Sequence, residues 1–272
     1  MSPIVVPSFP LGSRHQLNYA WWRPVLEIVT FLVITVALVF AVGYAMMWAG
    51  ADPSTDQYGE LFLYLTVAVE VPAALIAVKL AGRRPLDTVF GTGPAPKLWT
   101  VLLAYLVALA VMFVVLGLIS VYAYGSSWDR SVAGVTRTFP LTVVLVMCAA
   151  LGEELAFRGL AFQAFSALTK RPLLGALIST LLFVAIHLPG SAAEFAHYFV
   201  DGALYSWLAW YFGGIAFPFA AHAAWNTVVD MQDYGIPGSI SAMLTQFAAS
   251  AAAVAVLAYA FRGAARPGAL KG

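Results

Sequence analysis

The chain has 272 residues, of which 62% are hydrophobic and only 10% are charged, whereas about 25% of the residues in an ordinary soluble domain carry a charge. Several apolar runs reach about 20 residues, the length that crosses a bilayer as a helix, and one globular core could not bury them all. A net charge of +1 argues against nucleic acid as a partner, and a single cysteine excludes an internal disulfide. The composition therefore predicts an integral membrane protein, a polytopic all-α bundle of transmembrane helices.

Eight apolar runs predict about eight spans, separated by glycine, proline and polar residues. The expected spans are Val25–Trp48, Tyr58–Leu80, Leu98–Tyr124, Phe139–Leu168, Leu173–Leu188, Phe195–Phe212, Ile215–Met231 and Ile240–Phe261. The fourth is longer than the roughly 20 residues that a perpendicular helix needs. The seventh is short and begins irregularly at Gly213 and Gly214. Irregular backbone within a bilayer is tolerated only against protein or water, so we expect the short spans inside the bundle.

Lysine and arginine are unevenly distributed between the two sides of the predicted membrane. With the N-terminus inside, eleven of the fourteen fall on the inner side, two on the outer side, and Arg158 within a span. Positive residues favour the cytoplasmic side, so both termini are expected in the cytoplasm, and the alanine-rich composition favours a bacterial cell membrane. We expect one structural domain in three parts: residues 1–138 with spans one to three and a cytoplasmic tail, 139–231 as the core of spans four to seven, and 232–272 with the last span and a short tail.

Three ionisable residues, Glu153, Glu154 and Arg158, lie inside the fourth predicted span. Each charge at the centre of a transmembrane helix costs roughly 2.5–3.5 kcal/mol on insertion scales. Glu154 precedes Arg158 by four residues, the favourable order for an ion pair on a helix, and this predicts a supporting pair. Glu153 is turned about 100° from Glu154 and has no counter-charge on its own helix. A desolvated carboxylate of this kind suits a general base.

Two further pairs follow at the same spacing, Phe183 with His187 in the fifth span and His222 with Asn226 in the seventh. A histidine on an apolar helix is more often a hydrogen-bonded core residue than a catalyst. Inside a bilayer, however, an ionisable side chain is a functional candidate by default. Glu153, the two histidines and Asn226 come from three different spans at similar depth, so they could converge on one site.

The three motifs together resemble the CPBP family, which contains CAAX proteases and bacteriocin-processing enzymes and is also called the ABI or type II CAAX prenyl endopeptidase family. The motifs that carry the resemblance are Glu-Glu-x-x-x-Arg at 153–158, Phe-x-x-x-His at 183–187 and His-x-x-x-Asn at 222–226. The aromatic Phe157 before Arg158 and the glycine Gly159 after it also follow the family pattern. The resemblance covers roughly residues 139–230, and the preceding part contributes only hydropathy and a number of spans.

The resemblance implies an intramembrane endopeptidase that acts on a membrane-associated or lipidated protein or peptide. Glu153 matches the residue that activates the attacking water, with assistance from His187, and His222 with Asn226 matches the pair that stabilises the oxyanion. Glu154, Arg158 and Phe183 are supporting residues. This mechanism requires no cofactor. Zn²⁺ remains an alternative, and Glu153, His187 and His222 would then be its ligands.

Two other functions stay open. Glutamate and histidine at mid-depth also suit a proton- or solute-coupled transporter, although the chain shows no repeat between its halves. A non-catalytic immunity or accessory membrane protein is the third possibility. Outside the motifs, we expect a mutual hydrogen bond between His197 and Asp201, a position near the membrane interface for Glu27, and a capping or partnering role for Glu70 at a helix kinked by Pro72. The oligomeric state and the substrate are open.

Overall fold

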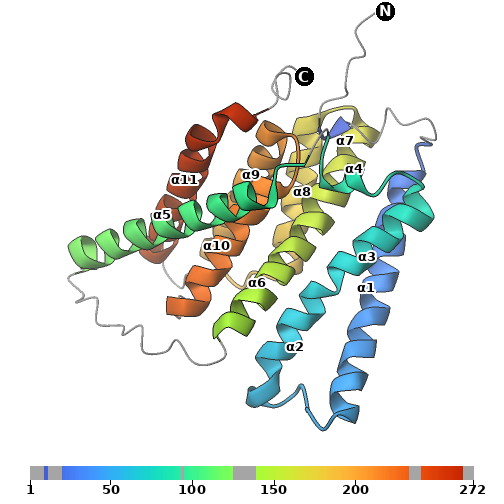
Figure 1. Ribbon diagram of the computed structural model, residues 1–272, viewed down its shortest axis with the longest axis horizontal. Coiled ribbons are helices and arrows are strands. Elements are labelled where there is room, and N and C mark those ends of the chain that lie inside the picture. The colour runs from blue at the N-terminus through green and yellow to red at the C-terminus, as the bar shows by residue number, and fades with distance from the viewer. Residues whose placement is uncertain (1–8, 12–19, 93–94, 125–138, 233–239, 266–272) are drawn as a thin grey trace, which may run out of the picture.

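The computed structural model describes residues 9–11, 20–92, 95–124, 139–232 and 240–265, and these residues form helices and connecting turns (Figure 1). The α-helices are α1 (Arg23–Trp48), α2 (Asp56–Ala68), α3 (Glu70–Ala77), α4 (Asp87–Phe90), α5 (Leu98–Tyr124), α6 (Phe139–Glu154), α7 (Gln163–Thr169), α8 (Pro172–Ile186), α9 (Ala192–Phe212), α10 (Ala216–Gln232) and α11 (Ile240–Ala260). Two π-helical segments, Val78–Gly82 and Leu155–Phe162, continue α3 and α6. The all-α prediction is confirmed.

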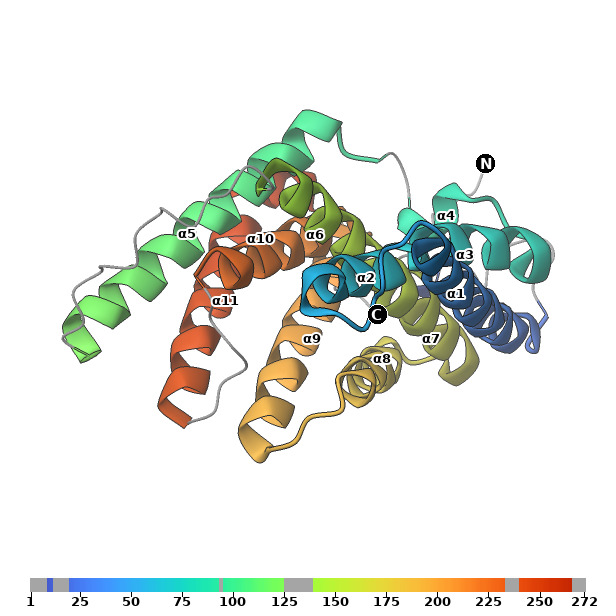
Figure 2. The same ribbon diagram turned by 90° about the horizontal axis from the view of Figure 1, so that it is seen from below.

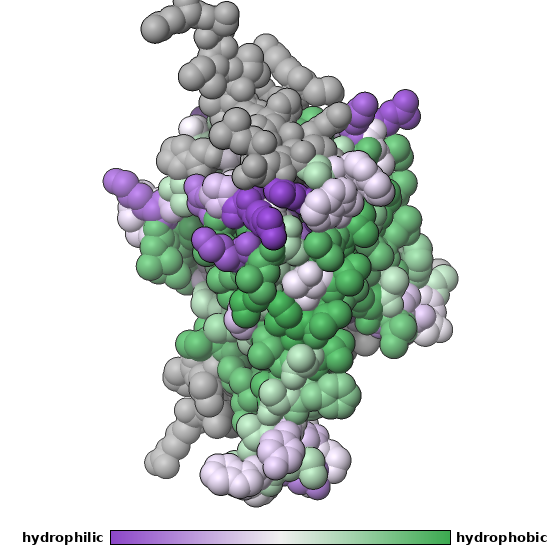
Figure 3. All heavy atoms as spheres, turned by 90° about the vertical axis from the view of Figure 1, so that its right-hand side faces the viewer, coloured by the Kyte–Doolittle hydropathy of each residue, from purple (hydrophilic) through white to green (hydrophobic). Residues whose placement is uncertain are grey.

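Four of the described helical stretches are long and apolar enough to cross a membrane. They are Arg23–Trp48, Leu61–Gly82, Leu98–Ile119 and Met243–Ala260. Their outer faces are apolar: Val33 and Phe40 of α1 are 64% and 75% exposed. Figure 3 shows the resulting hydrophobic band on the side of the molecule that α1 faces, with hydrophilic residues beyond its edge. Such a band is stable against lipid and not against water, so the protein is an integral membrane helix bundle.

Four further helical stretches, the one from α6 to α7 and those of α8, α9 and α10, are shorter or more polar than these. The fourth predicted span runs without a chain break from Phe139 to Thr169, through α6, a π-helical segment and α7. The fifth predicted span is only the 15 residues of α8. The seventh begins after Gly213, whose φ of 72° ends α9 in the left-handed conformation that glycine adopts readily. The helices are placed as expected, while the number of eight spans and the orientation of the termini stay predictions.

Helix α6 lies in the middle of the bundle, between α2 on one side and α10 on the other (Figure 2). Small and large apolar residues from α5, α9, α10 and α11 form one buried cluster. A second cluster joins α1 and α3 to the π-helical segment that follows α6. The charged motif at the end of α6 therefore lies where these two clusters meet.

Glycine at position 152 allows α2 to approach α6 closely. A Cβ atom on Gly152 would lie 2.5 Å from the carbonyl oxygen of Val67 and 3.0 Å from the Cβ atom of Glu70. The kink between α2 and α3 occurs at this contact, because Pro72 has no N–H to donate to Ala68, the last residue of α2. Gly152 thus fixes the distance between the kinked helix and the residue that precedes Glu153.

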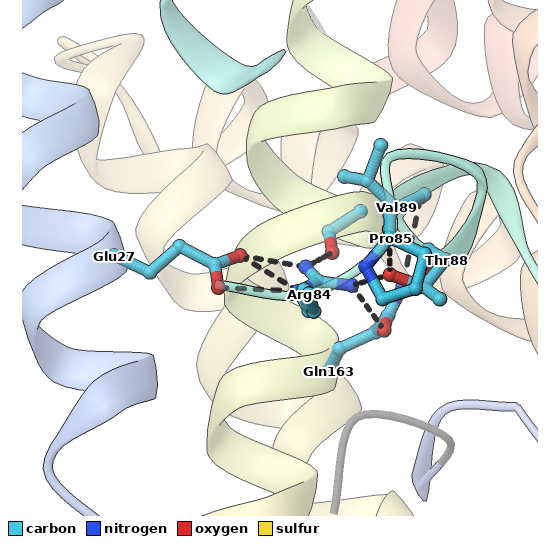
Figure 4. A network of polar contacts seen from close by, with 7 residues as sticks. Glu27, Arg84, Pro85, Thr88, Val89 and Gln163 are labelled. Carbon is cyan, nitrogen blue, oxygen red and sulfur yellow. Dashed lines mark hydrogen bonds and ion pairs between the residues drawn. The ribbon is translucent and has the colours of Figure 1, made fainter. Parts of the chain in front are cut away.

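The structure contains a buried ion pair near the start of α1, between Glu27 and Arg84, that was not predicted from the sequence. Glu27 is only 6% exposed and binds Arg84, with 2.6 Å between Oε1 and Nη2 (Figure 4). Arg84 also donates to Thr88, to the side-chain oxygen of Gln163 and to the carbonyl of Gly159. The prediction that Glu27 reaches the interface is therefore wrong. Its partner lies 57 residues away in the sequence, so periodicity could not reveal the pair.

We expect Glu27→Gln to destabilise the protein by about 3–5 kcal/mol, because it leaves the charge of Arg84 buried without its partner. Unfolding by denaturant in detergent or lipid measures the change. The double variant Glu27→Gln/Arg84→Met serves as the control and should be more stable than Glu27→Gln alone, since no unpaired charge remains. A single variant as stable as the wild type would contradict the pairing.

Gly152→Ala should lower the free energy of unfolding by about 1–3 kcal/mol, because the added methyl group collides with backbone that cannot rotate away. Gly43 in α1 provides a matched control: a Cβ atom there would lie 3.5 Å from the ring of Phe62, an ordinary contact. Gly43→Ala should be neutral or slightly stabilising, since alanine favours a helix by up to about 1 kcal/mol over glycine. Equal effects of the two substitutions would show that the α2–α6 approach is not tight.

Candidate active site

The charged motif lies at the point where helix geometry changes. Glu153 and Glu154 are the last two residues of α6, and the π-helical segment begins at Leu155 and ends at Phe162. A regular α-helix was expected here, so this detail of the prediction is wrong. Single π-turns inside α-helices occur frequently at functional sites. The carbonyl oxygen of Gly159 within this segment accepts a hydrogen bond from the side chain of Arg84.

Glu154 and Arg158 form the predicted ion pair. Oε1 of Glu154 lies 2.8 Å from Nη1 of Arg158, and both side chains are completely buried. Arg158 donates a second hydrogen bond, 2.9 Å long, to the carbonyl of Gly202 in α9. Its guanidinium also lies 5.0 Å from the ring centre of Phe183 and 5.4 Å from that of Tyr205. Pairing, hydrogen bonding and cation–π contact together offset the loss of water around this charge.

His222 of α10 connects the two glutamates. Its Nδ1 lies 2.9 Å from Oε1 of Glu154, and its Nε2 lies 3.3 Å from Oε2 of Glu153. The ring of Tyr205 stacks on the imidazole with 5.0 Å between ring centres. Glu153 lacks a partner only within its own helix, as the sequence indicated. The counterpart comes from a different helix, and a helix-by-helix analysis of charge could not find it.

The contacts of His222 restrict which of its ring nitrogens carries a proton. A carboxylate only accepts hydrogen bonds, and a neutral imidazole has one N–H and one lone pair. With Glu154 neutralising Arg158, the short Nδ1 contact makes Nδ1 the donor. Nε2 of the neutral ring then carries the lone pair and lies 3.3 Å from Oε2 of Glu153 without a hydrogen bond. A proton taken up by either group would lie between them, so Glu153 and His222 form a candidate acid–base couple.

His187 packs against Phe183, whose ring also lies near His222. The ring centre of Phe183 is 4.5 Å from that of His187 and 6.0 Å from that of His222. Nδ1 of His187 lies 2.7 Å from the carbonyl oxygen of Phe183, and since a carbonyl only accepts, Nδ1 must donate. Neutral His187 consequently keeps a lone pair on Nε2. Among the described contacts, none joins His187 directly to Glu153.

Asn226 follows His222 by one turn of α10 and is half-buried. It makes no hydrogen bond to Glu153 or His222 within the described part of the chain. The structure thus brings Glu153, Glu154, Arg158 and His222 into one connected group. Phe183 packs against that group, and His187 and Asn226 lie at its edge.

The donor atoms do not fit a zinc site. Within the described residues, no three side chains of His, Cys, Asp or Glu come together in a way that could hold a metal ion. Both ring nitrogens of His222 already face carboxylates, and His187 packs against the rings of Phe183 and Tyr198. The set of Glu153, His187 and His222 suggested by the sequence is therefore not assembled as a set of ligands, and no step below uses a metal.

Helix α9 supplies contacts that the motifs did not reveal. Gly202 and Tyr205 face Arg158 and His222, and the ring of Tyr198 lies 4.1 Å from that of His187. Tyr198, Gly202 and Tyr205 follow one another at intervals of four and three residues and so share one face of α9. This spacing could have been recognised in the sequence. The expected hydrogen bond between His197 and Asp201 is absent: Nε2 and Oδ2 are 3.8 Å apart, too far for a hydrogen bond although both side chains are buried.

Comparison with known proteins agrees with the three motifs. Residues 135–228 match the family described as type II CAAX prenyl endopeptidase Rce1-like. The chain is 27% identical over 207 residues to the uncharacterized protein YyaK of Bacillus subtilis (strain 168), a match that covers 72% of this chain and 68% of that protein. No solved structure matches the chain. The matched segment includes every residue from Glu153 to Asn226, so the resemblance to this family is confirmed over residues 135–228.

Proposed function

We propose that the protein is an intramembrane endopeptidase in which Glu153 activates the attacking water. The observation that carries this proposal is the connected row of Glu153, His222, Glu154 and Arg158, because it ends in a carboxylate whose Oε2 lies 3.3 Å from an imidazole nitrogen. The match to an endopeptidase family supports proteolysis as the general activity. The assignment of individual residues to steps is ours.

In the proposed reaction, the Glu153–His222 couple accepts a proton from water as the water oxygen bonds to the scissile carbonyl carbon. The same proton is delivered to the amide nitrogen as the carbon–nitrogen bond breaks, so one water is consumed and the couple returns to its starting state. Glu154 and Arg158 hold the imidazole in one orientation. A positioned acid or base of this kind contributes about 10²–10⁴-fold to the rate.

The geometry changes one role that the resemblance implied. An oxyanion donor needs an N–H aimed at the substrate, and both ring nitrogens of His222 face glutamates in this arrangement. We therefore assign His222 to the base and keep Asn226 as the oxyanion donor, with a side-chain amide that suits this task. His187, which keeps a lone pair on Nε2, is placed as the assisting base at the edge of the site.

The proposed substrate is a membrane-associated or lipidated protein or peptide, which would reach the site from the bilayer. The proposed setting is a bacterial cell membrane, with both termini in the cytoplasm. A prenylated carboxyl-terminal segment is the substrate class that the family description suggests.

Glu153→Gln should reduce cleavage by about 10²-fold or more, because an amide cannot accept the proton of water. Newly formed peptide termini are counted by mass spectrometry in membranes that contain the wild type or the variant, and the cleaved sequence is then tested in proteoliposomes. Asp87→Asn, the same exchange of carboxylate for amide at an exposed position of α4, is the control and should cleave normally. Equal cleavage by Glu153→Gln would remove Glu153 as the base. Proton flux that needs Glu153, without any cleavage, would support the transporter instead.

Cleavage by the purified protein should persist in the presence of metal chelators, because the donor atoms are not arranged as a metal site. The measurement compares initial rates before and after prolonged dialysis against a chelator, with and without added Zn²⁺. Loss of activity on dialysis and its return with Zn²⁺ would overturn the metal-independent mechanism.

A further inference from the structure

A third carboxyl group lies at the site and belongs to none of the three motifs. Glu70 is the first residue of α3 and lies near the middle of the candidate span Leu61–Gly82. The kink at Pro72 separates α3 from α2, and both helices pack against α6. In Figure 1, α2 and α3 follow each other along one side of α6.

The backbone contact at Gly152 brings Glu70 to the catalytic carboxylate. Gly152 immediately precedes Glu153, and a Cβ atom on it would be 3.0 Å from the Cβ atom of Glu70. Glu70 and Glu153 therefore lie on neighbouring helices, α3 and α6, at the same level of the bundle.

Glu70 has a buried oxygen with an unfilled hydrogen-bonding position. Its Oε2 makes no hydrogen bond within the described part of the chain, whereas Oε2 of Glu153 lies 3.3 Å from Nε2 of His222. Buried polar atoms in native proteins nearly always have a partner, either another protein atom or an ordered water. A proton on one of the two neighbouring carboxyl groups, Glu70 or Glu153, would give Oε2 of Glu70 such a partner, directly or through one water.

The surrounding charges decide which group keeps that proton. Glu153 faces Nε2 of His222 at 3.3 Å. On the elements packed against α3, Glu27 is bound to Arg84 and Glu154 to Arg158. The remaining described cations there, Arg23 and Lys79, form no ion pair with Glu70. Two like charges cannot both persist at such a position, so the group without a cation is the one that is neutral.

We propose that Glu70 is a positioning residue of the active site: as a neutral acid it donates a hydrogen bond, directly or through one water, to the carboxylate of Glu153. This inference rests on the proposed function, since it assigns Glu70 a task in the same reaction. The hydrogen bond holds one oxygen of Glu153 in place while the carboxylate acts on water. Glu70 keeps its proton throughout, so the balance of the hydrolysis is unchanged.

The test compares two variants of the full-length protein in lipid. Glu70→Gln should retain cleavage within a few-fold, because its amide N–H replaces the carboxyl O–H as donor. Glu70→Leu should lower kcat by about 10–100-fold, the effect of one hydrogen bond to a charged group, with little change in KM. Its thermal stability should not fall, since it removes a buried polar group.

Three kinetic outcomes would overturn the proposal. Full activity of Glu70→Leu would show that the hydrogen bond is not needed. Equal losses in Glu70→Gln and Glu70→Leu would show that an ionisable proton is required instead of a donor. A fall in kcat of Glu70→Leu that follows its loss of thermal stability would show that Glu70 only supports the kinked helix.

Infrared spectroscopy provides a readout that needs no substrate. The wild type at neutral pH should show the C=O stretch of a protonated carboxylic acid, and this band should disappear in Glu70→Gln. In Glu153→Gln the band should remain but change frequency, because the acceptor has changed. A band unaffected by either substitution would overturn the proposal. If the bands behave as expected while even the wild type cleaves nothing, the carboxyl pair stands and the endopeptidase assignment falls.

Discussion

The structure of this site depends on the burial of one positive charge. Arg158 is completely buried by protein, inside a bundle whose outer face consists largely of apolar side chains. A charge in that position requires an anion and further acceptors, because removing one partner of such a pair leaves a desolvated charge. Glu154 and the carbonyl of Gly202 meet this requirement. The bond to Gly202 connects the π-helical segment after α6 to α9. Oε1 of Glu154 also lies 2.9 Å from Nδ1 of His222, so the same carboxylate positions the imidazole.

The acid–base couple follows from that anchor. Glu154 holds Nδ1 of His222, and this directs Nε2 toward Glu153. Arg158 is thus connected to Glu153, the proposed base, through a carboxylate and an imidazole. Glu70 lies on the kinked helix that Gly152 allows to approach α6. The site is thus assembled from α3, α6, α9 and α10. Their contacts together restrict the position of the Glu153 side chain.

Local spacing predicted part of this arrangement. The ion pair between Glu154 and Arg158 needs only four residues of helix, so it could be read directly from the sequence. The helices follow the apolar runs, and the motif order led to the Rce1-like segment. The contact between Glu153 and His222 joins residues that are far apart in the chain, and only packing determines it. The same holds for Glu27 with Arg84. The π-helical turn after Glu154 also depends on tertiary contacts, such as the bond from Arg84 to Gly159, and no residue pattern indicated it.

The central claim is that Glu153 acts as a base on water and not as a nucleophile on the peptide bond. Single-turnover cleavage in water enriched in oxygen-18, with the purified protein in lipid, tests this claim directly. If water attacks the peptide carbonyl, the first product carries the heavy oxygen in its new carboxyl group, and Glu153 carries none. If the first product contains only ordinary oxygen and the label is found in the carboxyl group of Glu153, the attack was made by Glu153 itself and the account is contradicted.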